Sequence, residues 1–116
     1  MRNTTIPLDI EPMRAEARRV LDVDAPEMEY DTAALEQLAV TFREQIRGLI
    51  PEVGAKAQQL PRTSADRACA MACVGEAEMR LRIGPGDSDL LRGTVAQKLA
   101  RSVVALCGHY ARMSAR

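Results

Sequence analysis

Aromatic side chains are scarce in this sequence, which contains no tryptophan, one phenylalanine and two tyrosines among its 116 residues. Alanine contributes 18 of the residues behind its hydrophobic fraction of 47%. Leucine, isoleucine, valine and methionine must therefore supply nearly all of the buried apolar area, which stabilises a fold by about 25 cal/mol per Å². The sequence thus predicts a single domain over residues 1–116 with a thin core, and a thin core makes the domain a candidate for self-association.

An excess of either charge is also lacking, because 16 Lys and Arg residues balance 16 Asp and Glu residues. Direct binding to nucleic acid or to anionic membranes usually needs a basic surplus, so we expect neither kind of partner. The sequence has no basic and apolar leader at its start and no apolar run of transmembrane length. We therefore expect a cytoplasmic protein.

The balanced charge is unevenly distributed along the chain. Residues 1–36 carry nine acids and four bases, whereas residues 80–116 carry two acids and seven bases. Either the two segments attract each other within the fold, or the basic end binds an acidic partner, and the pattern leaves both interpretations open.

Apolar residues recur at helical spacing in four segments, and no segment alternates with the period of a strand over a comparable length. The first predicted helix covers residues 9–22, with Asp9 as its N-cap, and an acidic linker follows it. We therefore divide the domain into an N-terminal helix with its linker over residues 1–30 and a helical core over residues 31–116.

The second predicted helix, from Asp31 to residue 60, has the strongest apolar stripe. Pro51 falls on the solvent side of this helix, where we expect it to kink the helix rather than end it. A third helix is predicted over residues 64–83, and a Gly-Pro-Gly turn at 84–86 separates it from a fourth that is capped within residues 87–89. Four helices with short connections predict an all-α, antiparallel helical bundle.

The three cysteines are an odd number, which favours free thiols over a disulfide framework. Together with the single histidine, Cys69, Cys73, Cys107 and His109 offer four ligands of the types that zinc prefers. In a straight helix the directions of Cys107 and His109 differ by about 200°, so the helix cannot aim both at one ion. Small thiols packed among alanines explain the cysteines more simply, and we expect no metal site and no cofactor.

No complete catalytic set is evident in the sequence. A cysteine nucleophile needs an adjacent base and an orienting group, and His109 falls off the stripe that faces the other helices. Glycine-rich phosphate loops and the motifs of serine hydrolases and zinc proteases are absent as well. We therefore assign no catalytic residue and favour a non-catalytic protein.

The third predicted helix carries an unusual charged pair. Arg67, Glu78 and Arg82 share one side of this helix, which we expect to face solvent. The opposite side, expected to be buried, holds Glu76 and Arg80 four residues apart, so that the two side chains can pair. Such a pair is either structural or part of a functional cleft, because perturbed ionisable groups gather at functional sites.

Four segments resemble a known family, namely Leu49–Val53, Arg67–Ala77, Ala100–Val103 and Leu106–Tyr110. In them the chain resembles small actinobacterial proteins that are described only as natural product biosynthesis proteins of unknown function. The family usually has an acid at the positions of Gly108 and Ala111, where this chain has none. The resemblance implies a setting in specialised metabolism and no particular activity, and the usage of fourteen arginines and two lysines agrees with an actinobacterial origin.

Three functions are compatible with these observations. The leading one is a non-catalytic accessory or interaction protein in specialised metabolite biosynthesis that acts through protein–protein contacts. The second is a small-molecule-binding protein or minor enzyme whose pocket lies between the third and fourth predicted helices. The predicted residues of that pocket are Glu76, Arg80, Cys69, Cys73, Tyr110 and His109. The third is a regulator that binds a transcription factor, and in each case we expect a homodimer held by apolar side chains that a thin bundle leaves exposed.

Overall fold

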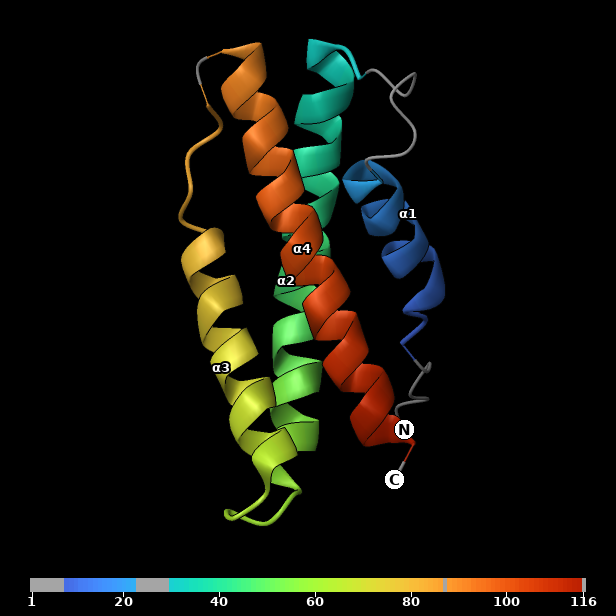
Figure 1. The fold of residues 1–116 in the computed structure, drawn as a ribbon, viewed down its shortest axis with the longest axis vertical. Helices are drawn as coiled ribbons and strands as arrows, with labels where there is room; N and C mark the ends of the chain where they lie inside the picture. The colour runs from blue at the N-terminus through green and yellow to red at the C-terminus, as the bar shows by residue number, and fades with distance from the viewer. Residues whose placement is uncertain (1–7, 23–29, 87, 116) are drawn as a thin grey trace, which may run out of the picture.

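A computed structural model of the chain describes residues 8–22, 30–86 and 88–115. Within these ranges it contains four helices and no strand (Figure 1): α1 (Glu11–Leu21), α2 (Thr32–Gln58), α3 (Ala65–Arg80) and α4 (Asp89–Ser114). The predicted all-α class and the number of helices are confirmed. The linker predicted between the first two helices lies mostly at positions 23–29, outside the described residues.

Three of the helices begin where a short polar side chain caps them. Asp31, Ser64 and Ser88 each accept a hydrogen bond from a backbone N–H in the first turn, at 2.8, 3.2 and 3.2 Å. These bonds pair donors that a helix leaves without an internal partner, and each cap stabilises the helix by about 1 kcal/mol. The start of α1 differs from the prediction, because its N-cap is Ile10 and not Asp9. Asp9 instead accepts a longer bond, at 3.3 Å, from the first N–H of the helix.

The predictions for Pro51 and for the end of α3 have different outcomes. α2 continues through Pro51 to Gln58, and Pro51 is exposed, so its missing N–H removes one backbone bond on the solvent side only. A kink at Pro51 stays a prediction. α3 ends at Arg80 and not at the predicted Ile83, whose backbone N–H donates to the carbonyl of Arg80 at 3.1 Å in a turn.

The linker from α3 to α4 depends on one glycine. Gly86 has a φ of 84°, in the left-handed region that side chains disfavour. A Cβ at this position would also lie 3.0 Å from the backbone nitrogen of Arg92, in the first turn of α4. The linker can therefore pass this close to α4 only with glycine at position 86.

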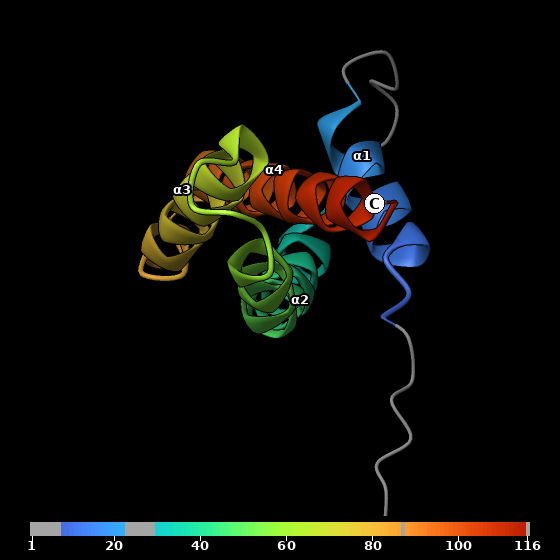
Figure 2. The same cartoon turned by 90° about the horizontal axis from the view of Figure 1, so that it is seen from below.

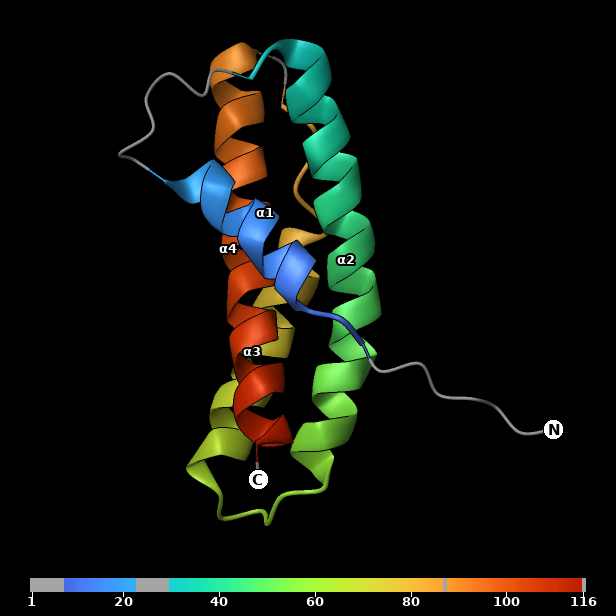
Figure 3. The same cartoon turned by 90° about the vertical axis from the view of Figure 1, so that its right-hand side faces the viewer.

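α4 is the central helix of the bundle. It packs against α1, α2 and α3, and its contact with α2 is the most extensive between the described helices. Successive helices alternate in direction, so α2 and α4 lie side by side and run the same way (Figures 1 and 3). α1 packs on the side of α4 that lies away from α3 (Figure 2).

α3 is shorter than its two neighbours, and this shapes the molecule. It lies beside the second halves of α2 and α4, while the linker that follows it runs along their first halves (Figure 1). At this face, α3 therefore covers the second halves of α2 and α4, whereas only the linker covers their first halves.

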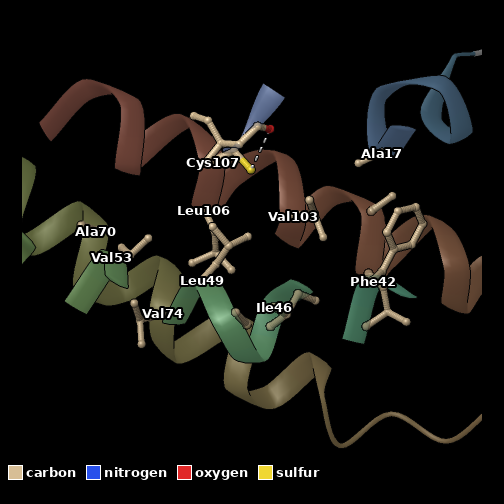
Figure 4. Packing of buried hydrophobic residues seen from close by; sticks show 14 of the residues in the cluster. Ala17, Phe42, Ile46, Leu49, Val53, Ala70, Val74, Val103, Leu106 and Cys107 are labelled. Carbon is tan, nitrogen blue, oxygen red and sulfur yellow. Dashed lines mark hydrogen bonds between the residues drawn. The ribbon is translucent and has the colours of Figure 1, made fainter. Parts of the chain in front are cut away.

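The core lies along the meeting faces of α2 and α4 (Figure 4). The largest buried side chains of α2 are Phe42, Ile46 and Leu49, each with 0% of its area exposed. α3 contributes mainly the small residues Ala70 and Ala77, which let its backbone approach the other helices but bury little apolar area. Other buried apolar residues include Ala17, Val53, Ala57, Val74, Val95, Leu99, Val103, Leu106 and Met113.

α1 is attached to α4 by a small set of contacts. Ile10 and Ala17 are its buried apolar side chains. The Cys107 Sγ of α4 lies 3.9 Å from the carbonyl oxygen of Ile10, a contact drawn as a dashed line in Figure 4. In return the Arg14 Nη2 donates to the carbonyl oxygen of Cys107 at 3.4 Å. Two polar contacts thus accompany the apolar ones at this junction.

Candidate functional site

A groove runs between α3 and α4, with a volume of about 460 Å³. Its lining residues on α3 are Cys69, Ala72, Cys73, Glu76 and Arg80, and those on α4 are Arg101, Ser102, Ala105 and His109. Five of the six predicted site residues thus lie in one place, at the location predicted for a pocket. We call this site the α3–α4 groove.

Arg80 is held in place at one end of the α3–α4 groove. Its Nη1 donates to the backbone carbonyl of Lys98 on α4 at 2.8 Å. Its Nη2 lies 3.9 Å from the Glu76 Oε1, one helical turn earlier on α3. The Arg80 side chain is 28% exposed and the Glu76 side chain 71% exposed, so the ion pair lies at the surface and is weak, whereas the bond to Lys98 joins the two helices.

The burial predicted for Glu76 is wrong. The buried side of α3 is formed by Ala70, Val74 and Ala77, which lies about 90° around the helix from the side predicted. Glu76 and Glu78 are both exposed. Of the three residues expected on the solvent side, Glu78 and Arg82 are exposed, whereas Arg67 is partly buried, because a long arginine can emerge from the edge of a buried face.

The two cysteines of the α3–α4 groove are free thiols. Cys69 is exposed and Cys73 is half-buried. Burial, and in second place the nearby carboxylate of Glu76, raises the pKa of Cys73 above its ordinary value of 9.0. Cys73 is therefore a neutral thiol at neutral pH, and a neutral thiol is a poor nucleophile and a poor metal ligand.

His109 lies at the other end of the α3–α4 groove, and it is partly buried. Burial and the positive charge of Arg112 lower the pKa of His109 below 6.5, so the imidazole is neutral at neutral pH. Among the described residues no group of three or more His, Cys, Asp and Glu side chains is arranged to hold a metal ion. The α3–α4 groove therefore offers the charged groups of Arg80, Arg101 and Glu76 together with neutral side chains for binding.

Cys107 does not join His109. It is fully buried against α1, where burial raises its pKa to about 11 against a partly opposing effect of Arg14. His109 instead faces α3 from the rim of the α3–α4 groove. The two ends of the Cys-x-His segment therefore point into different junctions, as the angle between them predicts.

Tyr110 is the predicted site residue that does not line the α3–α4 groove. It is half-buried and packs against the core, and the Nζ of Lys56 from α2 lies 5.1 Å from the centre of its ring. This geometry is typical of a cation–π contact, which links the C-terminal parts of α2 and α4.

A second groove, of about 400 Å³, lies beside the first half of α2, where α3 is absent. Its lining residues are Leu35, Glu36, Ala39, Val40, Arg43, Pro85, Gly86 and Arg92, and we call it the α2–linker groove. Arg43 fixes its linker wall, because the Nη1 and Nη2 of Arg43 donate to the carbonyls of Leu81 and Ile83 at 3.2 and 2.8 Å. Across it, the Arg92 Nε lies 3.7 Å from the Glu36 Oε1.

Sequence reasoning did not find the α2–linker groove. Its walls come from a helix and a turn about 45 residues apart, and no local sequence pattern predicts that the two lie together. The available signal was Val40, which falls on the solvent side of an otherwise regular stripe and is 51% exposed. Leu90 and Leu91, at the start of α4, are exposed as well, by 80% and 46%.

Comparison with known protein families gives a match that covers most of the chain. Residues 11–114, which include α1 to α4, match a family of unknown function, DUF6415. The chain belongs to this family. Both grooves lie within the matched region.

No curated protein and no solved structure shows significant similarity to the chain. Among the described residues, no helix has both the length and the apolar character that crossing a bilayer requires.

Proposed function

We propose that this member of DUF6415 is a non-catalytic accessory protein that acts by contact with another protein in specialised metabolite biosynthesis. The observation that carries the proposal is the apolar surface at the end of the bundle that α3 does not cover. Val40, Leu90 and Leu91 are the exposed large apolar residues of this end, and they account for three of the five in the described chain. Several exposed large apolar side chains at one end of a fold can mark an interaction site.

The biosynthetic setting is supported by the resemblance in Leu49–Val53 and Arg67–Ala77, and an actinobacterial origin belongs to the same proposal. A cytoplasmic location is proposed with it, because all three cysteines are free thiols, as is usual in a reducing compartment. A non-catalytic role is consistent with the chemistry of the α3–α4 groove, whose half-buried thiol and imidazole are both held in their neutral forms.

Affinity capture tests this function with a matched pair of variants. The chain carrying Val40→Glu places a charge in the apolar end, while Met79→Glu places the same charge on a residue of α3 that is 67% exposed and lines neither groove. We expect one protein to be retained by the native chain and by Met79→Glu but lost with Val40→Glu. Equal retention by both variants, or no retained partner at low salt, would contradict the proposal.

A second function is favoured by a separate observation, the convergence of five predicted residues in the α3–α4 groove. A volume of about 460 Å³ is within the range of small-molecule sites. A ligand present at one hundred times its dissociation constant stabilises the folded protein by about 2.7 kcal/mol, which a thermal-shift screen of pathway metabolites detects. A flat screen with metabolites at such concentrations would count against this second function.

A further inference from the structure

The two ends of the α3–α4 groove differ chemically. One hydrogen bond shows which residues of α3 and α4 lie opposite each other. Arg80 of α3 donates to the carbonyl of Lys98 of α4, so these two residues lie at the same level of the groove. The two helices run in opposite directions (Figure 1). Cys69, eleven residues before Arg80, therefore lies at the level of His109, eleven residues after Lys98, about 16 Å along the groove.

The end near Lys98 is cationic. Arg80 and Arg101 both line the groove there, and Glu76 is the carboxylate among the lining residues. Arg80 is anchored by its Nη1 at 2.8 Å, so its guanidinium is oriented before any ligand arrives. The ion pair of Arg80 with Glu76 is 3.9 Å long and belongs to a carboxylate that is 71% exposed, so a ligand anion can replace it at low cost.

At the end near His109, the side chains that line the groove are neutral at neutral pH. The Cys73 thiol is held protonated and the His109 imidazole neutral, both mainly by burial. Between the two ends the groove is lined by Glu76, Cys73 and Ala72 of α3 and by Ser102 and Ala105 of α4. The methyl groups of Ala72 and Ala105, in the half of the groove nearer His109, suit an apolar group that has no donor or acceptor of its own.

We propose that the α3–α4 groove binds an amphipathic organic anion, with its anionic group on Arg80 and Arg101 and its apolar body between Ala72 and Ala105. Guanidinium groups favour carboxylate and phosphate, because their paired N–H donors match two anionic oxygens. This inference rests on the second proposed function and names the class of ligand for it. The inference also predicts that Glu76 weakens binding, because its carboxylate repels an anion placed beside Arg80.

The test compares three probes with the same eight-carbon chain: octanoate, octan-1-ol and octylammonium. Amide chemical shifts of the labelled chain should move with octanoate around Ala72, Cys73 and Ala105, and should stay fixed around Val40 in the α2–linker groove. Octanoate should also slow the alkylation of Cys73 by N-ethylmaleimide severalfold. Octan-1-ol should bind more weakly, and octylammonium should not bind.

Variants that change one charge test whether the groove selects an anion. Arg101→Gln should weaken octanoate binding about three- to tenfold, because it removes one charged donor. Glu76→Gln should strengthen binding, since it removes the opposing carboxylate. Arg47→Gln is the matched control, because Arg47 is an exposed arginine outside both grooves, and it should leave affinity unchanged. All three positions are exposed, so the variants are expected to fold, which circular dichroism checks.

Several results would overturn the inference. One is failure of octanoate to bind at millimolar concentration, and another is shifts confined to the region of Val40. Equal affinity for octanoate and octylammonium, or equal losses with Arg101→Gln and Arg47→Gln, would show that charge at the groove does not select the ligand. Binding of octylammonium alone in the groove would retain a small-molecule site there and reject the anion, so the inference can fail while the second function survives.

Discussion

Cys107 has surroundings that tie its ionisation to folding. Its side chain is fully buried at the junction of α1 and α4, and burial raises its pKa from 9.0 to about 11. Below pH 9 the thiol is neutral in both the folded and the unfolded chain, so its burial contributes fully to stability. Between pH 9 and 11 the unfolded chain ionises while the folded one stays neutral, and the stability that this thiol contributes is lost.

We therefore expect the free energy of unfolding of the native chain to fall, relative to that of Cys107→Ala, as the pH rises from 9 to 11. Urea denaturation at a series of pH values measures this difference, and the effects of all other titrating groups cancel between the two proteins. A difference that stays constant across this range would show that Cys107 ionises as easily in the folded chain as in the unfolded one.

Glu76 and Glu78 provide a second prediction for single residues. Both carboxylates are exposed, and the pair of Glu76 with Arg80, at 3.9 Å on neighbouring turns of α3, is a surface pair. Such pairs contribute about 0.3–0.5 kcal/mol. Glu76→Ala and Glu78→Ala should therefore both cost less than about 1 kcal/mol in urea denaturation. A loss of several kcal/mol for Glu76→Ala alone would restore the buried position that the structure rejects.

At the scale of an element, the packing of α3 allows a prediction about stability. Ala70 is fully buried where α3 approaches the other helices, so Ala70→Leu should overpack the junction and cost about 1–3 kcal/mol. Ala68→Leu is the matched control, since Ala68 is exposed on the same helix, and it should change stability by no more than about 0.5 kcal/mol. Similar unfolding midpoints for the two variants would mean that α3 is loosely packed.

The buried side of α3 is the part of the fold that the sequence predicted wrongly. In α2 and α4 the buried side carries large residues such as Phe42, Ile46 and Leu99, so the apolar stripe identifies it directly. The buried side of α3 has alanine and valine, and further alanines occur on its exposed side. Arg67 also misled the assignment, because it is partly buried and its Nη1 reaches back to the carbonyl of Leu60 at 2.9 Å.

Helical spacing explains why only part of the candidate site could be predicted. Residues spaced by one helical turn share a side, so Cys69, Cys73, Glu76 and Arg80 come together whichever way α3 is turned. What their spacing cannot supply is the neighbour across the groove, which depends on how two helices pack. The hydrogen bond from Arg80 to Lys98 belongs to that packing, and it joins residues 18 apart through a backbone carbonyl that carries no sequence signal.

At the scale of the whole molecule, we predict a homodimer through the end of the bundle that carries Val40 and Leu90, so that a second copy and the proposed protein partner compete for this end. Apolar contacts are not screened by salt, so the dimer should persist in sedimentation experiments at both low and high ionic strength. The double variant Val40→Glu, Leu90→Glu should shift the chain to monomer, while Met79→Glu should not. A native chain that stays monomeric at high micromolar concentration in both buffers would exclude the dimer.

The central position of α4 has a consequence for synthesis on the ribosome. α1 packs mainly on α4, and α4 is the last of the four helices to leave the ribosome. At about 5–20 residues per second, translation of its 26 residues takes on the order of 1–5 seconds. During that time Ile10 and Ala17 have no surface to cover them, and only the contact of α2 with α3 is available. Nascent chains of this protein should therefore be targets for chaperones that bind exposed apolar segments, until the last helix closes the fold.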